Sequence, residues 1–494
     1  MKTKHNTVKL LLLYLIICIS GCSSDTVEQN EETPEETTEN TAKKIVLSVT
    51  DYKHEFVGGG VSIGLFLGHH YSMNQTSQDE AIRLLAQDCN MKYFQDYIEI
   101  YPSDDPEYFD RRANYVKAAK VYRPELEFSL VGNKFPVDLM HEITVNGEKF
   151  QALNTDDPEI YNRLANWWFE LFKGFYERGV SVEILNVVNE PDLDRPFRKQ
   201  HYGLNGDTKE AVSRVFKYAV PKFKEMLDDP EINTLNMKVP LIMGPSTISP
   251  NGCLTYMEYF KNNHPDVWNN IDIIATHQYE NGANVQLFKN IVNQAEGKMF
   301  YQSETHALKG DGLNLDAVFA SRDLKAALSL SNLFSTAVNN GVSSWFYFEN
   351  NYPNVEVHPG GLLSIPWQAE KPIPYKHYYV FKALTSAQPA NSNIIGYSMD
   401  NPSKSELIAF IKKDQNIVYA HYSNYSTKAQ DISITVKGAN NNILKISEYN
   451  LTSTSEINNG ALVDTKTYQT PEDNITLTTE PLSINTIKIT FNTP

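Results

Sequence analysis

The sequence predicts an α/β fold, in which a (β/α)8 TIM barrel is followed by a C-terminal antiparallel β-sandwich. Between about Val57 and Leu384, short apolar runs alternate with longer amphipathic stretches, the pattern of β-α units around a parallel sheet. Eight apolar runs can be counted, the number that closes a barrel. Beyond about Thr385, alternating strands are separated by Asn, Ser, Gly and Thr turns, which is typical of a sandwich.

The barrel strands are expected where apolar runs end in polar residues. They are Val57–Ile63, Met91–Ile98, Leu126–Val131, Val182–Val188, Pro240–Gly244, Ile271–His277, Met299–Ser303 and Val342–Phe348. Helices are expected where apolar residues recur every three or four positions. They are Gln78–Cys89, Asp157–Arg178, Lys209–Leu227, Asn284–Ala295 and Ala320–Asn339. The sandwich strands include Ser405–Lys412, Asn416–Ser423, Ile432–Val436 and Ile484–Phe491, with Lys44–Thr50 as a further candidate.

The first residues have the form of a lipoprotein signal. A basic start precedes Leu10–Ile19, an apolar run too short to stay in a bilayer as a permanent span. Ile19-Ser20-Gly21-Cys22 resembles a bacterial lipobox, which implies cleavage before Cys22 and lipidation of its thiol. We therefore expect a signal peptide over residues 1–21 and a membrane anchor at Cys22. An ordinary secretory signal is the alternative.

Residues 22–43 are expected to form a flexible acidic tether, because they are rich in Glu and poor in large apolar side chains. An acidic segment just after the lipidated cysteine resembles the signal that sends lipoproteins of the Bacteroidetes type to the outer surface of the outer membrane. The barrel is then assigned to residues 44–384 and the sandwich to residues 385–494. Cys89 and Cys253 are the cysteines left for a disulfide.

The composition excludes some classes of partner and suggests another. A net charge of −16 argues against nucleic acid, because binding phosphates requires clustered cations. No His, Cys or Asp cluster has the spacing of metal ligands, so neither a metal nor another cofactor is expected. Aromatic residues make up 11% of the chain, including 28 Tyr, and sugar rings pack on aromatic faces. A monomer is expected.

Two carboxylates follow apolar runs at positions where a barrel builds its active site, the carboxyl ends of its strands. The fourth run is followed by Asn189-Glu190-Pro191-Asp192, and the seventh ends in Glu304. Strands four and seven lie across the barrel mouth from each other. Cleavage of a glycosidic bond requires one carboxyl group to protonate the leaving oxygen and another to attack or stabilise the sugar centre. Glu190 and Glu304 are therefore the catalytic candidates.

These motifs resemble glycoside hydrolase clan A, which has Asn-Glu after strand four, Glu after strand seven and often His-x-Tyr after strand six. The matching residues here are Asn189-Glu190, Glu304 and His277-Gln278-Tyr279. The resemblance implies a retaining hydrolase with Glu190 as acid/base and Glu304 as nucleophile. It also implies that Asn189 holds the sugar 2-hydroxyl, Tyr279 hydrogen-bonds the nucleophile and His277 lines the cleavage subsite.

Within the clan, two segments resemble family 30: the entry Ile45–Ile63 and the end Leu477–Phe491. The segments Asn189–Leu193 and Ile274–Tyr279 resemble family 39 equally well. The chain departs from the clan on strand two, because Met91–Tyr101 contains no Arg where the clan usually has one.

The aromatic contact that the clan places on strand eight is less clear. Trp345 lies inside the eighth run and is our candidate, whereas Phe348 ends that run and also fits the expected place. Trp367, in the loop after strand eight, is a candidate platform for a sugar ring. His69 and His70 follow the first run and are candidates for lining the cleft.

The sequence thus predicts a surface-anchored enzyme that cleaves β-glycosidic bonds of a polysaccharide or oligosaccharide. The alternative is a surface lipoprotein that binds carbohydrate on a barrel without cleaving it. The sugar, its linkage and endo or exo action remain open, because loops set the shape of the cleft. Arg195 and Arg198, after the Asn-Glu-Pro motif, leave open whether the substrate is charged.

Overall fold

The structure is a computed structural model. It describes residues 42–64, 66–98, 105–145, 147–154, 157–193, 201–202, 208–279, 283–306, 324–353, 361–402, 405–412, 415–455 and 463–492. The expected signal peptide, Cys22 and all but the last two residues of the tether lie outside this part of the chain. Among the described residues, no helix is both long and apolar enough to span a bilayer.

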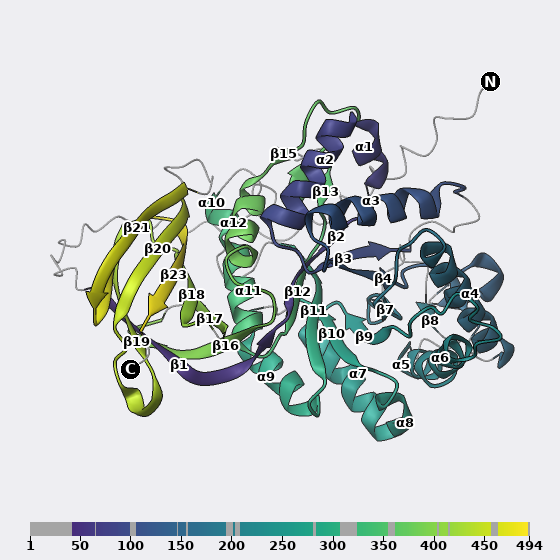
Figure 1. The fold of residues 1–494 in the computed structure, drawn as a ribbon. Coiled ribbons are helices and arrows are strands. Elements are labelled where there is room, and N and C mark those ends of the chain that lie inside the picture. Colours follow the sequence, from purple (N-terminus) through teal and green to yellow (C-terminus); the bar gives the residue numbers. More distant parts are fainter. Residues whose placement is uncertain are drawn as a thin grey trace, which may run out of the picture. The chain divides into compact units, whose positions relative to one another are not determined.

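Eight parallel strands close into a barrel in the order β10-β11-β12-β2-β3-β4-β7-β9 (Figure 1). They are β2 (Gly58–Ser62), β3 (Tyr93–Tyr97), β4 (Glu127–Val131), β7 (Ile184–Asn186), β9 (Leu241–Thr247), β10 (Ile273–His277), β11 (Met299–Thr305) and β12 (Ser344–Tyr347). Each lies within or overlaps one of the eight predicted runs. The predicted barrel is therefore confirmed. In the order of the sequence, the second barrel strand is β3, the fourth is β7 and the seventh is β11.

Alternation along the strands divides the barrel residues between two environments. A compact cluster fills the interior: Tyr93, Ile184, Met243, Ile273, Ala275, Tyr301 and Phe346. Neighbouring positions such as Phe94, Leu185 and Trp345 belong instead to the large core between the strands and the helices. A side chain at Gly60 would collide with the ring of Phe346, so this strand needs glycine there.

Helices cover the outside of the barrel. They are α1 (Leu67–Ser72), α2 (Gln75–Arg83), α3 (Tyr108–Tyr122), α4 (Glu159–Tyr176), α5 (Thr208–Arg214), α6 (Val220–Asp228), α7 (Pro250–Asn263), α8 (Pro265–Trp268), α9 (Val285–Gln294), α10 (Leu324–Ala327), α11 (Ser329–Asn339) and α12 (Lys376–Thr385). The π-helical segments η2 (Leu84–Asp88) and η5 (Val215–Ala219) continue α2 and α5. The oxygens of Asn74, Ser249 and Asn284 accept backbone N–H groups at the starts of α2, α7 and α9. The five predicted helices are confirmed, whereas α3, α7 and α12 were not predicted.

Two small sheets form in the segments that follow barrel strands. One consists of β5 (Met140–Val145), β6 (Glu148–Leu153) and β8 (His201–Tyr202). The other consists of β13 (Asn351–Tyr352), β14 (Leu363–Ser364) and β15 (Ile373–Pro374). The first comes after β4 and the second after β12, so both extend the carboxyl-end side of the barrel, where barrel enzymes place their sites.

Eight C-terminal strands form one nine-stranded sheet together with β1 (Lys43–Phe56), in the order β21-β20-β23-β18-β17-β16-β1-β19-β22. They are β16 (Ser392–Met399), β17 (Leu407–Lys412), β18 (Ile417–Asn424), β19 (Gln430–Lys437), β20 (Ile446–Ser455), β21 (Val463–Glu472), β22 (Asn474–Thr479) and β23 (Ser483–Phe491). Side chains from both halves of this sheet share one apolar core, so the sheet folds over on itself as a sandwich.

Strand β1 (Lys43–Phe56) belongs to the sandwich, although most of its residues fall in the segment assigned to the barrel from the sequence. It pairs with β16 in the antiparallel sense and with β19 in the parallel sense. The expectation that Lys44–Thr50 adds a strand to the sandwich is therefore confirmed. At its end, Phe56 packs edge-on against Phe410 of β17 and Phe334 of α11, so this face of the sandwich packs into the core around the barrel.

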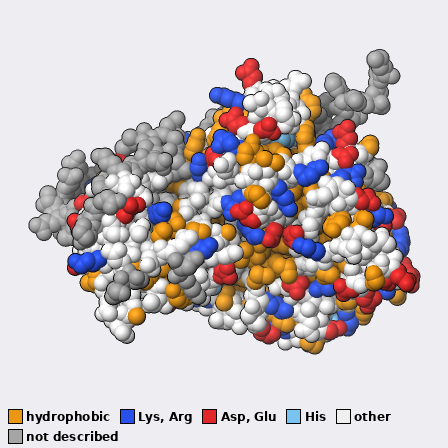
Figure 2. All heavy atoms as spheres, in the orientation of Figure 1, with side chains coloured by type: hydrophobic (Ala, Val, Ile, Leu, Met, Phe, Trp, Pro, Cys, Tyr) orange, Lys and Arg blue, Asp and Glu red, His pale blue; other side chains and the backbone are white. Residues whose placement is uncertain are grey.

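Charged side chains show no strong separation by sign on the face drawn in Figure 2. Acidic and basic groups are interspersed over the barrel, with apolar patches between them. Many of them form ion pairs, such as Arg178 with Asp110 and Lys217 with Asp266.

Candidate active site

Glu190 lies at the carboxyl end of β7, four residues beyond Asn186. Its backbone is left-handed, with φ at 47°, which is uncommon for a residue with a side chain. The Glu190 N–H donates to the carbonyl of Ser246 at 2.9 Å and so fixes this turn against the end of β9. The side chain is buried, with 5% of the residue exposed. Backbone strain at such a position is typical of functional sites.

Glu304 lies within β11 and receives two hydrogen bonds from tyrosines. The Tyr279 hydroxyl donates to Oε1 at 2.7 Å, and the Tyr97 hydroxyl donates to Oε2. Burial raises the pKa of both phenols well above the ordinary value, and the negative charge of Glu304 raises them further. Both tyrosines therefore remain protonated donors at any physiological pH, and the Glu304 carboxylate is held from two sides.

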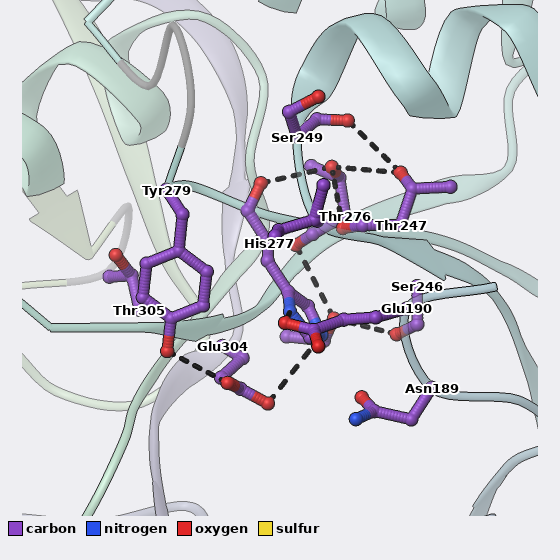
Figure 3. A network of polar contacts seen from close by, with 12 residues as sticks. Asn189, Glu190, Ser246, Thr247, Ser249, Thr276, His277, Tyr279, Glu304 and Thr305 are labelled. Atoms are coloured by element: carbon purple, nitrogen blue, oxygen red, sulfur yellow. Dashed lines mark hydrogen bonds and ion pairs between the residues drawn. The ribbon is translucent and has the colours of Figure 1, made fainter. Parts of the chain in front are cut away.

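His277, at the end of β10, lies between the two glutamates (Figure 3). Its Nδ1 is 3.0 Å from Glu190 Oε1, and its Nε2 is 3.7 Å from Glu304 Oε2. One ligand-type atom from each of the three residues lies within 4.8 Å of the others. The two carboxyl groups predicted from strand ends thus meet across the barrel mouth, with a fully buried imidazole bridging them.

A layer of polar side chains beneath the carboxylates holds them in place. Gln95 Nε2 donates to the Tyr97 hydroxyl at 3.1 Å and to the Ser303 carbonyl at 3.0 Å. The hydroxyls of Ser303 and Ser246 are 2.8 Å apart, and Asn186 Nδ2 donates to Ser246 at 2.7 Å. This chain of hydrogen bonds runs from β3 through β11 and β9 to β7, so it fixes the strand ends that carry both glutamates.

Asn189 precedes Glu190 and is also buried. Its Nδ2 donates to Asn133 Oδ1 at 3.0 Å, which leaves its Oδ1 without a hydrogen-bond partner among the described residues. Leaving a buried polar atom unsatisfied costs about 1–3 kcal/mol. A ligand hydroxyl placed against Asn189 would satisfy this atom.

Asp192 follows in the same loop and is mostly buried beside the start of α7. Burial raises its pKa to about 6, although the backbone N–H of Ile248 donates to Oδ1 at 2.9 Å and opposes that shift. Asp192 therefore changes charge in the mildly acidic range.

No protein-family profile matches the sequence, and no curated protein matches it either. Solved structures do match. An endoxylanase of glycoside hydrolase family 30 from Clostridium papyrosolvens is 15% identical over 90% of this chain and 100% of its own, with a TM-score of 0.65. An endo-β1,6-glucanase is 13% identical over 91% and 94%, with a TM-score of 0.62. A family 39 enzyme from Xanthomonas axonopodis is 12% identical over 93% and 99%, with a TM-score of 0.57.

The chain has the fold of glycoside hydrolase family 30. The match covers 90% of this chain, so it extends over both the barrel and the sandwich. The resemblance to clan A, read from a few residues of sequence, is thereby confirmed at the level of the fold. At these identities the comparison concerns architecture, and the site must be interpreted from its own geometry.

Strand β3, the second barrel strand, lacks the arginine expected from the clan and carries Asp96 and Tyr97 instead. Asp96 points outward and forms a buried ion pair with Arg112 of α3, whose guanidinium lies 3.9 Å above the Tyr108 ring centre. Tyr97 points inward to Glu304. Sequence reasoning missed Tyr97 and Asn133, because a tyrosine in a strand and an asparagine in a loop are more often structural.

The expectation that Trp345 contacts the substrate is wrong. Trp345 is fully buried among Phe334 of α11 and Phe381 of α12, and its indole N–H donates to Gln278 Oε1 at 2.9 Å. Odd and even positions of β12 face opposite sides, and Trp345 lies on the helix side. Phe348 fits the expected place instead. Its ring lies 5.5 Å from that of Tyr97, a tyrosine that touches Glu304.

The other aromatic candidates divide into an exposed and a buried group. Trp367 is 62% exposed, and the His69 ring meets it edge-on at 5.6 Å. That Trp367 is a platform for a sugar ring stays a prediction. His70 is buried against Tyr115, and burial lowers its pKa to about 4. His70 is therefore a neutral core residue. Arg195 and Arg198 lie outside the described residues, and a cationic rim stays a prediction.

Two further expectations concern cysteines and metals. Cys89 and Cys253 are both buried and free, so the possible disulfide between them is excluded. Glu190, His277 and Glu304 are spaced closely enough to hold a metal ion. However, both oxygens of Glu304 already accept phenol hydrogen bonds, which a cation would compete with. That no metal is required stays a prediction.

Proposed function

We propose that the protein is a retaining glycoside hydrolase that cleaves β-glycosidic bonds of a polysaccharide or oligosaccharide at the cell surface. The observation that carries this proposal is the pair Glu190 and Glu304, whose closest carboxyl oxygens lie within 4.8 Å of each other. A retaining mechanism needs carboxyl groups about 5–5.5 Å apart, whereas an inverting one needs about 6.5–9.5 Å to admit a water molecule. The observed spacing supports retention.

In the first step, a carboxylate oxygen of Glu304 attacks the anomeric carbon while the bond from that carbon to the leaving oxygen breaks. Glu190 gives its proton to the leaving oxygen. In the second step, the ionised Glu190 takes a proton from water, the water oxygen attacks the anomeric carbon, and the bond to Glu304 breaks. Two inversions at the same carbon leave the configuration retained, and both glutamates return to their starting charge.

The buried tyrosines and His277 prepare Glu304 and Glu190 for these different roles. Tyr97 and Tyr279 stay protonated and stabilise Glu304 as the anion that a nucleophile must be. His277 Nδ1 orients the Glu190 carboxyl group at 3.0 Å. The Oδ1 atom of Asn189 is available to the sugar 2-hydroxyl, as the resemblance to clan A implies.

The structural neighbours suggest which polymers to assay first. One is named an endoxylanase and another an endo-β1,6-glucanase, so xylan and β1,6-glucan are the first polymers to assay. We expect wild-type protein to release reducing sugar from at least one member of a panel of plant, fungal and algal polysaccharides. A non-catalytic carbohydrate-binding protein would bind a polymer of the panel without releasing product, and that outcome would reverse the proposal.

The proposed location is the outer membrane, with a lipid on Cys22 and the acidic tether of residues 22–43 placing the enzyme on the cell exterior. The polymer would then be cleaved before uptake. We expect the mature protein to sediment with membranes and the Cys22→Ala protein to be released in soluble form. A Cys22→Ala protein that remained in the membrane fraction would contradict the anchor.

A further inference from the structure

The outer surface of the barrel carries a hollow that the proposed reaction does not use. Its volume is about 670 Å³, within the range of about 300–1,000 Å³ typical of small-molecule pockets. It is lined by Pro158, Tyr161, Asn162, Glu210, Arg214, Tyr218 and His264. These residues come from α4, α5, η5 and the turn before α8. Figure 1 shows α4, α5 and α6 grouped on one side of the barrel.

The wall of the hollow is aromatic. The rings of Tyr161 and Tyr218 lie 5.1 Å apart at an angle of 46°, so they form two adjoining faces. Tyr161 is buried, which fixes its ring, whereas Tyr218 is 48% exposed. An exposed aromatic ring held against a buried one is a flat, rigid surface on which an apolar face of a ligand can pack at low entropic cost.

The floor of the hollow is polar and already ordered. Glu210 accepts hydrogen bonds from Tyr259 at 2.9 Å, His264 at 2.6 Å and Arg214 Nε at 3.0 Å. Burial opposes ionisation of Glu210, but these bonds outweigh it and lower the pKa of its carboxyl group. The amide of Asn162 lies at the edge of the same hollow. A ligand with several hydroxyl groups finds fixed donors and acceptors here.

Among the described residues, the charges around the hollow are balanced. Arg214 pairs with Glu210, and Lys217 beside Tyr218 pairs with Asp266 at 3.0 Å. An anionic ligand would compete with these carboxylates, and a cationic ligand would compete with the basic partners. A purely apolar ligand is disfavoured, because it would bury the polar groups of the floor without giving them hydrogen-bond partners, which is costly. The combination of an aromatic wall, a neutral field and many hydrogen-bonding groups fits an uncharged sugar.

We propose that this hollow is a second carbohydrate-binding site, which takes a short stretch of a neutral polysaccharide and is distinct from the cleft at the barrel mouth. This inference rests on the proposed function, since the polymer held here is the one on which the barrel acts. The hollow would keep the anchored enzyme on its polymer between cleavage events, so that the effective concentration of substrate near the cleft stays high.

The test is a binding titration with full-length Glu304→Ala protein, which cannot turn over its ligand. The probes are the hexasaccharide of xylose and the hexasaccharide of β1,6-linked glucose, chosen from the neighbours' named activities. We expect two binding events per chain by calorimetry. Adding Tyr218→Ala should weaken one of them about tenfold or more, because the exposed stacking surface is lost. Tyr218→Phe should retain it.

Matched variants control for general effects. Tyr52 is a tyrosine of similar exposure, 43%, on β1 of the sandwich, and Tyr52→Ala should leave both events in place. Asn162→Ala, at the exposed edge of the hollow, should weaken the same event as Tyr218→Ala. A single binding event that is insensitive to Tyr218 and Asn162 would overturn the proposal, as would absence of binding to every probe.

The two proposals fail in different ways. If wild-type protein hydrolyses a hexasaccharide but Glu304→Ala protein binds it at a single site that is insensitive to Tyr218→Ala, the hollow is not a sugar site and the enzyme assignment stands. If a Tyr218-dependent event is seen but wild-type protein hydrolyses neither probe nor any polymer of the panel, the sugar site stands and the catalytic assignment fails.

Discussion

Glu304 and Glu210 each contact tyrosine and histidine side chains, but they differ in burial and in whether a cation is paired with them. At the barrel mouth, Glu304 has Tyr97, Tyr279 and His277 around it. On the outer helices, Glu210 has Tyr259, His264 and Arg214. Glu304 is almost wholly buried, whereas about 29% of the Glu210 side chain is exposed.

The difference shows which surroundings favour chemistry and which favour binding. The cation of Arg214 neutralises Glu210, and solvent screens what charge remains. In the described residues, Glu304 is held by two phenols that stay neutral and lies beside the buried His277 imidazole, within a low-dielectric site. Such a carboxylate can respond to a positive charge forming on a sugar carbon. Glu210, whose charge Arg214 neutralises, can only hold hydroxyl groups in place. Substitutions at and around the active site test this difference between Glu304 and Glu210.

Replacing Glu304 should have the largest effect. Glu304→Ala removes the proposed nucleophile, so turnover should fall by more than about 10⁴-fold. Added azide should restore it only by forming a glycosyl azide of inverted configuration. Glu210→Ala should cost stability, of order 1–3 kcal/mol, and far less activity on a short soluble aryl glycoside. Similar losses of activity for the two variants would show that the contrast between the sites is wrong.

Replacing Glu190 should separate the two steps of the reaction. Glu190→Ala should slow polysaccharide cleavage by about 10²–10⁴-fold, because the leaving oxygen is no longer protonated. Aryl glycosides with activated leaving groups should still glycosylate the enzyme, and azide should then give a product of retained configuration. Equal losses on activated and unactivated substrates would contradict the role of Glu190 as the acid.

Removing one phenol should have an intermediate effect. Tyr97→Phe deletes a hydrogen bond to a charged carboxylate, worth about 1.5–3 kcal/mol, so kcat/KM should fall about 10–100-fold. The acidic limb of the pH-rate profile should move to higher pH, because the ionised form of Glu304 loses a donor. The control is Tyr301→Phe, which removes a hydroxyl that lies near Tyr93 inside the barrel. A change of stability alone in Tyr97→Phe would make Tyr97 a structural residue.

Asp192 should give a smaller effect, seen in stability. Burial raises its pKa to about 6 in the folded chain, from an ordinary value of 3.8. The folded state therefore binds the proton more tightly, and this contribution is present below pH 4 and lost as pH rises through 6. Asp192→Asn should gain up to about 3 kcal/mol at pH 8 and nothing at pH 4. A difference in melting temperature that did not vary with pH would contradict this interpretation.

The sequence predicted the barrel because its strands are nearly continuous apolar runs, and each of the eight runs became a strand. The helices α3 and α12 were missed, since Tyr, Lys and Arg side chains interrupt their apolar spacing. The sandwich strands β20 and β22 were also missed, because β20 is rich in Ser and Thr and β22 in Thr, and alternate residues of β22 are exposed.

The site divides in a similar way. Glu190 and Glu304 were predicted because a polar residue that ends a buried strand lies at the barrel mouth. His277 and Tyr279 were predicted from the resemblance to clan A. Tyr97 was missed and Trp345 was misplaced for one reason. The side of a strand on which a residue lies depends on register, and a shift of one position exchanges the interior for the helix layer. The register of β12 is fixed by its pairing with β2, which becomes visible only in the folded structure.

The central claim is that Glu190 and Glu304 act as a retaining pair, and the configuration of the first product tests it most directly. Proton NMR should follow wild-type protein cleaving a β-linked oligosaccharide at a rate faster than mutarotation. We expect the β-anomer to appear first and the α-anomer only later, as the sugar equilibrates. Initial release of the α-anomer would mean inversion, and the carboxyl spacing and both roles would then have been assigned wrongly.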